Sequence, residues 1–282
     1  MADLTEHRLL IGDRAVTLLE GPAGWGEMSP LDGYPCDPGA ARRAAEEAAL
    51  DGWPPPIRAD VPVNALVPGP GFDPLAVVGF AAVKVKMRGP DDVDLVARVR
   101  DAVGPDVEVR VDANGAWPLE LAVEIIERLS RLDVRLVEQP VATIDELARL
   151  RPKVSIPIAA DECVRSVDDA RRIHQLGAAD AVVLKVQPLG GVRAALAVAD
   201  AAGVPAIPTS MMETSVGLAA GVALAAALPE LPYACGLATA ALVDDVTHEP
   251  LVPEGGRLRV RAVAPDPVLL ARYAVSSQET MS

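Results

Sequence analysis

Short apolar runs rich in Val, Ile and Ala alternate with amphipathic segments over most of the chain. Continuous apolar runs of this kind are typical of parallel strands buried on both faces. The runs cover residues 61–66, 82–87, 107–112, 134–138, 156–160, 181–185, 204–208 and, weakly, 233–237. Helical patterns lie between most of them, at residues 91–103, 118–132, 144–150, 166–176, 191–202 and 214–228.

Strands that alternate with helices at this spacing predict βα units and a parallel sheet. Because the runs number about eight, closure into a barrel is favoured over an open sheet. We therefore predict an α/β fold in which residues 61–244 form a TIM-type (β/α) barrel. The longest apolar run, residues 216–228, is too short and too rich in Ala and Gly to span a bilayer, and is predicted to be a buried helix.

The two ends of the chain lie outside this alternation and predict a second, smaller unit. The elements expected there are strands at residues 9–11, 15–20 and 257–263, a turn-rich corner at 21–27 and a helix at 38–50. Three successive prolines at residues 54–56 interrupt the chain, so we place a boundary near residue 60. Residues 1–60 and about 245–282 are predicted to form a small α+β capping domain, with the strand at 257–263 returning to the N-terminal part.

Composition narrows the class of protein. Half of the residues are hydrophobic but only 3% are aromatic, so the core must be built from Ala, Val, Leu and Ile. A net charge of −14 disfavours a nucleic-acid partner. Three widely spaced cysteines indicate a reducing compartment and neither a disulfide framework nor a zinc cluster.

The N-terminus carries acidic residues where a signal peptide would carry basic ones, and no apolar segment follows. We therefore expect a cytoplasmic protein that acts on a small molecule, without a nucleic-acid or membrane partner. The oligomeric state stays open, and a monomer is plausible.

Two lysines, Lys84 and Lys86, interrupt the apolar run at residues 82–87. Residues two apart in a strand point to the same face, so both ammonium groups should emerge side by side. Taken alone, the two lysines are more typical of an edge strand with a solvated lysine face. What favours a functional role is the set of ionisable residues that ends the following strands.

Each of the next four runs ends in a charged residue. These residues are Asp112, Glu138, Asp161 and Lys185. In a barrel the carboxyl ends of the strands meet at the active-site face, so these side chains should converge there. Three carboxylates suit a hard cation, and Mg²⁺ is the first choice.

Each of these residues also has a purely structural interpretation. Asp112 is followed by Ala-Asn114-Gly115, which predicts an Asx-type turn, and Asp161 precedes a helix and could cap it. Glu138 could be a charge at a strand end. The joint occurrence of ionisable residues at five successive strand ends favours a catalytic site.

The predicted chemistry is proton abstraction next to a carboxylate. A divalent cation that binds a substrate carboxylate acidifies the adjacent C–H bond. A lysine can remove that proton if its pKa is lowered, and a neighbouring lysine should lower it by like-charge repulsion. A lysine on the opposite side could act as a second base, an acid or a fixed cation.

The pattern Lys-x-Lys, then Asp, Glu and Asp at the ends of the next three strands, then Lys on the sixth, resembles the enolase superfamily, in the branch that contains the muconate-lactonising enzymes. Within that branch, three segments are similar to the o-succinylbenzoate synthases of menaquinone biosynthesis. These segments are residues 24–30 (Gly-Trp-Gly-Glu-Met-Ser-Pro), 214–217 and 231–237.

The resemblance implies a carbon–oxygen lyase that converts 2-succinyl-6-hydroxy-2,4-cyclohexadiene-1-carboxylate to 2-succinylbenzoate. It assigns the binding of Mg²⁺, for which Mn²⁺ could substitute, to Asp112, Glu138 and Asp161. Lys86 would be the base and then the acid of a syn elimination. Lys185 would stabilise the enediolate from the opposite face, and Lys84 would assist electrostatically.

The resemblance leaves substrate recognition less defined. Thr209, Ser210 and Glu213 follow the seventh run and are expected near the substrate, but no motif assigns their roles. The arginine-rich first strand that family members usually show is not found here. The expected substrate-closing loop, residues 29–37, offers little to grip a substrate.

Other functions use parts of the same residue set. An N-acyl amino acid racemase or a dipeptide epimerase would need the same lysines and metal, although residues 233–239 lack the acid that a dipeptide epimerase is expected to carry. A Schiff-base aldolase would leave the three carboxylates without a role. A non-catalytic barrel scaffold would leave every filled catalytic position unexplained.

Overall fold

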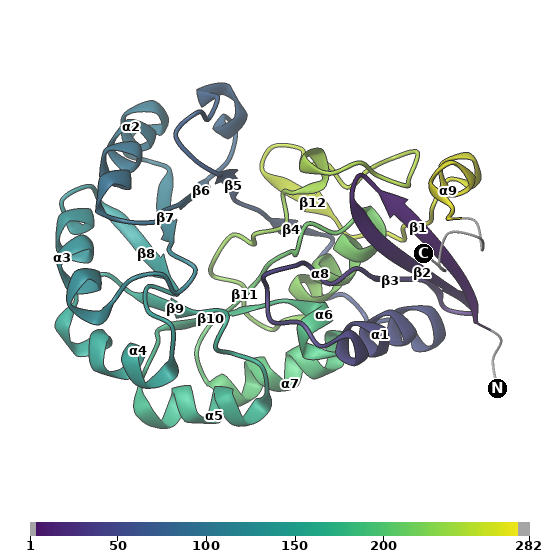
Figure 1. The fold of residues 1–282 in the computed structure, drawn as a ribbon, viewed down its shortest axis with the longest axis horizontal. Coiled ribbons are helices and arrows are strands. Elements are labelled where there is room, and N and C mark those ends of the chain that lie inside the picture. The colour runs from purple at the N-terminus through teal and green to yellow at the C-terminus, as the bar shows by residue number, and fades with distance from the viewer. Residues whose placement is uncertain (1–3, 276–282) are drawn as a thin grey trace.

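A curled, all-parallel sheet forms the centre of the larger part of the molecule, and helices cover its outer side (Figure 1). The computed structural model describes residues 4–275. The strand order β11-β10-β9-β8-β7-β6-β5 follows the sequence, as expected of successive βα units. The strands are β5 (Ala65–Val67), β6 (Ala82–Lys86), β7 (Glu108–Asp112), β8 (Val134–Glu138), β9 (Ile158–Ala160), β10 (Ala181–Leu184) and β11 (Ala206–Pro208). The predicted α/β fold is confirmed.

The weakly predicted run at residues 233–237 forms no regular strand, yet it joins the two edges of the sheet. Cys235 makes a parallel bridge with Val63 ahead of β5, and Gly236 makes one with Thr209 after β11. A Cβ on Gly236 would lie 2.7 Å from Cγ2 of Thr209, so only glycine allows this approach. Pairing of this run is limited to single bridges, in agreement with its weak strand pattern in the sequence.

The predicted strand at residues 61–66 divides into two. β4 (Asp60–Pro62) turns away from the parallel sheet and pairs antiparallel with β12 (Arg257–Arg259), whereas β5 joins the parallel sheet. The expectation that residues 257–263 return as a strand to the N-terminal part is therefore wrong. Only three of these residues form a strand, because their partner β4 is itself three residues long. The chain reaches the N-terminal sheet later, through α9 (Pro267–Tyr273).

Helices pack around the outside of the parallel sheet (Figure 1). They are α2 (Val93–Val103), α3 (Leu119–Ser130), α4 (Ile144–Leu150), α5 (Val167–Leu176), α6 (Val186–Leu189), α7 (Val192–Ala202) and α8 (Ser215–Ala227), with 3₁₀ turns at Pro74–Val77, Pro90–Asp92, Arg151–Lys153 and Ala240–Leu242. The longer helices match the predicted patterns to within about three residues. The one-turn helix α6 and the helix α9 were not predicted, because neither is long enough to show a clear period.

The helix α8 is buried on all sides, as the sequence predicts. It packs between β3, β4 and β11, and its alanines and glycines allow close contact on every face. Within residues 4–275, no helix combines the length and the apolar character that crossing a membrane requires.

The N-terminal residues form a three-stranded antiparallel sheet. Its strands are β1 (Thr5–Ile11), β2 (Arg14–Gly21) and β3 (Gly24–Met28). The sheet packs against α1 (Pro38–Glu46), which continues into a π-helical turn at Glu47–Asp51. The predicted turn-rich corner at residues 21–27 is wrong for most of its length, because Gly26 lies in a strand. A Cβ there would overlap the backbone of Ala45, so this glycine serves the close approach of α1 and not a turn.

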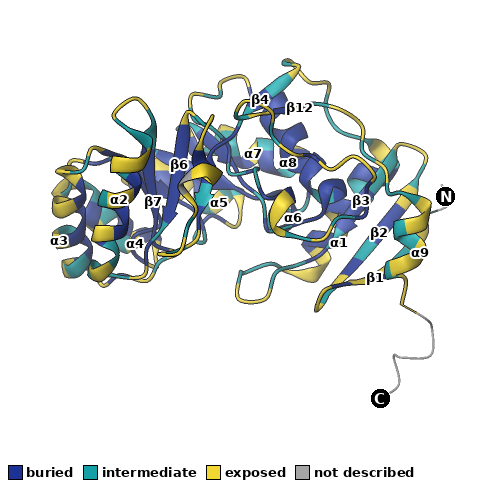
Figure 2. Ribbon diagram, turned by 90° about the horizontal axis from the view of Figure 1, so that it is seen from above, coloured by how far each residue is buried: buried dark blue, intermediate teal, exposed yellow. Residues whose placement is uncertain are grey.

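The interior of the curled sheet is filled beneath its carboxyl edge. Leu136, Ala159, Ala181, Val183 and Ile207 form a small apolar cluster there. Residues two positions further along these strands share the same face and lie closer to the carboxyl ends. Figure 2 shows the labelled strands of the sheet buried along most of their length, whereas the outer helices are exposed on their far side. Polar side chains at the strand ends therefore sit on a packed apolar floor.

Candidate active site

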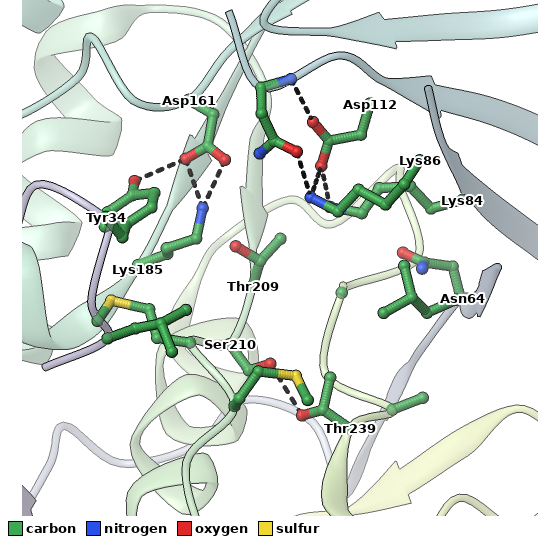
Figure 3. Close-up of a pocket in the computed structure, with 17 residues that line it drawn as sticks. Tyr34, Asn64, Lys84, Lys86, Asp112, Asp161, Lys185, Thr209, Ser210 and Thr239 are labelled. Carbon is green, nitrogen blue, oxygen red and sulfur yellow. Dashed lines mark hydrogen bonds and ion pairs between the residues drawn. The ribbon is translucent and has the colours of Figure 1, made fainter. Parts of the chain in front are cut away.

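A cavity of about 220 Å³ opens at the carboxyl ends of the parallel strands. Five of the six predicted catalytic and metal-binding residues line it: Lys84, Lys86, Asp112, Asp161 and Lys185 (Figure 3). Glu138, which is 3% exposed, lies directly behind Lys84. The whole chain contains four lysines, and three of them line this cavity. The sequence prediction that these groups converge at one edge of the sheet agrees with the geometry.

Lys84 and Lys86 extend from the same face of β6 and share one carboxylate. The Nζ atoms of Lys84 and Lys86 lie 3.0 Å and 2.7 Å from Oδ2 of Asp112. Lys84 also donates to Oε1 of Glu138 at 2.9 Å. Lys86 donates to Oδ1 of Asn114 at 2.9 Å. Lys84 is buried, whereas a third of the Lys86 side chain is exposed to the cavity.

Lys185 stands on the other side of the cavity (Figure 3). Its Nζ atom contacts both carboxylate oxygens of Asp161 at 2.5 Å. The hydroxyl of Tyr34 donates to Oδ1 of Asp161 at 2.8 Å, and the Lys185 ammonium lies 4.4 Å from the centre of the Tyr34 ring. A substrate in the cavity would thus have one lysine pair on one side and a third lysine on the other.

Burial and charge oppose each other at these groups. Burial favours neutral Asp112, but the ammonium groups of Lys84 and Lys86 outweigh it and hold the pKa of Asp112 well below its usual range. At Glu138, burial and the nearby charge of Asp112 raise the pKa to about 8. Asp112 contacts two ammonium groups and Glu138 contacts one, so the pKa values of the two carboxyl groups shift in opposite directions.

The expected lowering of a lysine pKa by its neighbour is not found at Lys84. Burial lowers the pKa of Lys84, but the charges of Asp112 and Glu138 outweigh this effect and leave the pKa above its ordinary value. The pKa of Lys185 is raised in the same way by Asp161. The sequence shows that Lys84 and Lys86 are neighbours. Only the structure shows which carboxylates each lysine contacts.

The three carboxylates have the chemistry of a site for a hard divalent cation. Asp112, Glu138 and Asp161 come from three neighbouring strand ends, and none is more than 3% exposed. Within the described residues, no three acidic, histidine or cysteine side chains are gathered closely enough to hold an ion together. In this structure the ammonium groups of Lys84 and Lys185 bind oxygens of these carboxylates. The three carboxylates are the type of ligand that a hard cation prefers, and the lysine ammonium groups balance their negative charge in this structure.

Two of the three predicted substrate residues line the cavity. The Thr209 hydroxyl is buried there with no hydrogen-bond partner among the described residues, and Oγ of Ser210 lies 2.8 Å from Oγ1 of Thr239. Glu213 does not line the cavity, and its expected proximity to a substrate stays a prediction. Its carboxylate turns inward and accepts the N–H of Met211 at 2.6 Å, because Met212 adopts a left-handed conformation that reverses the chain.

The sequence reasoning also missed residues that line the cavity. Tyr34 and Leu31 come from the loop of residues 29–37, so this loop contributes two side chains to the cavity wall, which the sequence did not indicate. Asn64 and Thr239 were not singled out either. Asn114 was interpreted as part of an Asx turn. The structure contains this turn, since the N–H of Asn114 donates to Oδ1 of Asp112 at 3.1 Å. The same residue also contacts Lys86, so a turn signal concealed a site residue.

Comparison with known proteins places these features in a family. The model of the enolase C-terminal domain-like family matches residues 74–265. The o-succinylbenzoate synthase of Thermobifida fusca is 54% identical over 257 residues, which cover 87% of this chain and 81% of that protein. The protein of the same name from Mycobacterium leprae is 44% identical, over 92% of this chain and 80% of its own length.

Two solved structures share the fold. Muconate cycloisomerase from Pseudomonas fluorescens matches with a TM-score of 0.82 and 22% identity, over 98% of both chains. Muconate lactonizing enzyme from Pseudomonas putida matches with a TM-score of 0.83 and 21% identity, over 98% of this chain and 99% of its own. At 21–22% identity, these two structures support the fold and nothing more. The family model and the curated relatives go further: the chain belongs to the enolase superfamily and, within it, to the o-succinylbenzoate synthases.

Proposed function

We propose that the protein catalyses the reaction of an o-succinylbenzoate synthase, a carbon–oxygen lyase of menaquinone biosynthesis. The reaction removes water from 2-succinyl-6-hydroxy-2,4-cyclohexadiene-1-carboxylate and yields 2-succinylbenzoate. The single observation that carries the proposal is the 54% identity to the o-succinylbenzoate synthase of Thermobifida fusca over most of both chains. The cavity agrees with it, because Lys86 and Lys185 lie on its opposite sides and Asp112 and Asp161 line it. Family membership supports the same reaction.

Asp112, Glu138 and Asp161 would hold the divalent cation of this reaction, Mg²⁺ by preference or Mn²⁺ in its place. The cation would supply positive charge at the substrate carboxylate and thereby acidify the neighbouring C–H bond. Lys84, buried against Asp112 and Glu138, would balance the negative charge of these two ligands.

Lys86 is proposed as the catalytic base. It borders the cavity with a partly exposed side chain, and Asp112 and Asn114 hold its Nζ atom. As a neutral amine it would take the proton alpha to the ring carboxylate. As an ammonium it would then return a proton to the departing hydroxyl on the same face, so that water leaves and the amine is restored.

Lys185 is proposed as a fixed cation on the opposite face. Its contact with both oxygens of Asp161 keeps it charged, as its raised pKa also indicates. A fixed positive charge stabilises the negative charge that develops on the substrate when the proton leaves. Thr209 and Ser210 would donate hydrogen bonds to the substrate from the wall between the two lysines (Figure 3).

We further propose that residues 61–244 act as a (β/α) barrel and that residues 1–60 with about 245–282 act as its capping domain. The bridges of Cys235 and Gly236 to both sheet edges support barrel closure. Packing of α9 on β1, and the bridge between Leu9 and Ala274, support one cap built from both chain ends. Residues 1–3 and 276–282 of this proposed cap lie outside the described residues. The acidic charge and the three unpaired cysteines support a cytoplasmic location.

The second candidate is racemisation of an N-acyl amino acid. The observation that favours it is again the pair of lysines on opposite sides of the cavity, since racemisation needs one base on each face. A dipeptide epimerase would use the same pair. Dehydration needs a base on one face only.

The deciding experiment follows the absorbance of the cyclohexadiene substrate with the purified protein, with and without Mg²⁺. We expect turnover with Mg²⁺, loss of turnover with EDTA and recovery on addition of Mg²⁺ or Mn²⁺. Full turnover by metal-free protein would contradict the metal assignment. No turnover under any condition, together with racemisation of an N-acyl amino acid, would favour the second candidate.

Metal binding can be tested separately from turnover. The nearly isosteric change Glu138→Gln should weaken Mg²⁺ binding at least tenfold in calorimetric titration while the protein stays folded, because it removes one anionic ligand. Glu213→Gln is the matched control, since Glu213 is equally buried but lies outside the cavity. Equal Mg²⁺ affinity for the two variants would exclude Glu138 as a ligand.

A further inference from the structure

Tyr34 makes two contacts with the ion pair on the Lys185 side of the cavity. Its hydroxyl donates to Oδ1 of Asp161 at 2.8 Å, and the Lys185 ammonium lies 4.4 Å from its ring centre. An aromatic face attracts a cation at this distance. The Lys185 ammonium is therefore enclosed between the carboxylate of Asp161 and the Tyr34 ring (Figure 3).

The loop that carries Tyr34 is attached to the segment that follows Lys185. The backbone N–H of Ser29 donates to Oε1 of Gln187 at 2.8 Å, and Nε2 of Gln187 donates to Oγ of Ser29 at 3.2 Å. Both residues are buried, and Gln187 follows Lys185 by two positions. The guanidinium of Arg14 also donates to the carbonyl oxygen of Ser29. We call the paired Ser29 and Gln187 contacts the Ser29–Gln187 clip.

The other end of the loop rests on the same part of the barrel. Asp37 caps α1 by accepting the N–H of Ala40 at 3.0 Å, and α1 packs against α6, the short helix that begins directly after Lys185. Both ends of the loop are thus attached to the turn that bears the lysine. Contacts at both ends of the loop therefore fix the position of Tyr34 relative to Lys185.

We propose that Tyr34 is a positioning residue for Lys185 and that the Ser29–Gln187 clip holds it in place. A lysine side chain has several rotatable bonds and can leave the face on which its charge is needed. The ring and hydroxyl of Tyr34 confine the ammonium to the side of Asp161, opposite Lys86. This assignment rests on the proposed function for its catalytic consequence, but the confinement itself is a property of the free protein.

The test measures confinement directly, in the absence of substrate. The protein is treated briefly with an amine-acetylating reagent, and mass spectrometry gives the acetylation rate of each lysine. Lys153 is exposed and remote from the cavity, so it serves as an internal reference. Tyr34→Leu removes both the ring and the hydroxyl, and should raise the rate at Lys185 about tenfold relative to Lys153, with less than a twofold change at Lys86. Tyr34→Phe keeps the ring and should raise it about threefold.

Two further variants separate positioning from general loosening of the loop. Leu31→Ala changes a side chain in the same loop and the same cavity, and should leave acetylation of Lys185 within twofold of the original protein. Gln187→Leu removes the clip and should raise acetylation of Lys185 as Tyr34→Leu does. With substrate and Mg²⁺, Tyr34→Leu should lower kcat about tenfold and change KM less.

An unchanged acetylation rate of Lys185 in both Tyr34 variants would overturn the proposal. An equal rise in Leu31→Ala would also overturn it, because any disturbance of the loop would then suffice. Since acetylation needs no substrate, these outcomes are distinct from failure of the proposed function, which only the turnover assay reports.

Discussion

Two buried charged residues on one strand, Arg110 and Asp112, differ in what surrounds them. They lie two positions apart on β7 and therefore on the same face of the sheet. Arg110 is 2% exposed, and its guanidinium group contacts other residues of the chain and not the cavity. Its Nε atom donates to Oε1 of Glu108 at 2.8 Å, Nη1 donates to the Ala234 carbonyl at 2.7 Å, and the guanidinium lies 5.1 Å from the Tyr233 ring centre.

Asp112 is as deeply buried but faces a cavity. One of its oxygens, Oδ2, is shared by Lys84 and Lys86, and the Lys86 side chain remains partly exposed. The cationic side chains of the neighbouring strands β6 and β7 point in different directions here. Lys84 lies opposite Arg110 in the pairing of β6 with β7, yet Lys84 reaches toward the carboxyl edge and Arg110 toward Glu108.

The difference shows how position along a parallel strand decides the use of a buried charge. Toward the amino end, Arg110 ties Ala234 and Tyr233 to the sheet, in the segment that joins the two sheet edges by single bridges. At the carboxyl end, loops leave room for a substrate, and shared ion pairs can rearrange. We therefore expect the Arg110 group to affect stability and the Asp112 group to affect turnover.

The largest expected effect is on turnover. Lys86→Met should lower kcat by about 10²–10⁴, the usual range for loss of a general base, and should abolish exchange of the substrate alpha proton with solvent. The free energy of unfolding should change by less than about 1 kcal/mol, because Lys86 is partly exposed and Asp112 keeps Lys84 as a partner. Rapid-quench assays and urea denaturation measure the two quantities.

Lys153→Met is the control for this variant, since it removes the one lysine outside the cavity and should change neither quantity. If Lys86→Met keeps dehydration while Lys185→Met abolishes it, the base lies on the other face. The carboxylate cluster would survive that result, but the assignment of Lys86 would not.

The next effect should fall on stability alone. Arg110→Met removes a buried cation with three anchoring contacts and should lower the free energy of unfolding by about 3 kcal/mol. This is the low end of the usual range, because the Glu108 side chain is 29% exposed and water can solvate it. Turnover per folded molecule should stay within about twofold of the original.

Arg135→Met is matched to this variant, because Arg135 also pairs with an acid near the amino end of a strand but is 62% exposed. Its effect on stability should stay within about 0.5 kcal/mol. A loss of turnover in Arg110→Met that exceeds its loss of folded protein would break the comparison between the two ends of β7.

The last prediction concerns the pH dependence of stability and compares Glu27 with Asp112. Glu27 accepts Oγ of Ser29 at 2.5 Å and the N–H of Gly217 at 3.0 Å, and has no basic side chain as a partner among the described residues. Burial raises its pKa from 4.5 to about 7. Between these values the folded protein keeps a proton that the unfolded chain releases, so stability is retained below pH 4.5 and falls as the pH rises to about 7.

This fall should reach up to about 3 kcal/mol, and Glu27→Gln should remove it. Asp112 should contribute with the opposite sign, because its lowered pKa stabilises the folded state above the ordinary carboxyl pKa and that stability is lost in acid. Urea denaturation of both proteins at pH 5 and pH 8 gives the difference. Parallel pH dependence in the original and in Glu27→Gln would show that Glu27 does not titrate in this window.

Much of the fold and of the chemistry was determined by local patterns. Period-two and continuous apolar runs identify strands such as β7 and β8, and a strand followed by a helix leads to a parallel neighbour. Once the strands are parallel, the residue that ends each run must lie at the same edge. Lys86, Asp112 and Lys185 could therefore be predicted together, without knowledge of any side-chain contact.

Only the tertiary structure decided which groups meet. Tyr34 reaches Asp161 across 127 positions of sequence, and no local period encodes that pairing. Glu213 follows the same strand as Thr209 but turns inward at Met212. Arg110 resembles Asp112 and Lys84 in sequence, as a charge within an apolar run, but it contacts Glu108 and Ala234 and not the cavity. A strand pattern determines the face and the edge on which a side chain lies. Its partner, its pKa and its exposure depend on chain segments that are distant in sequence and are brought close only by packing.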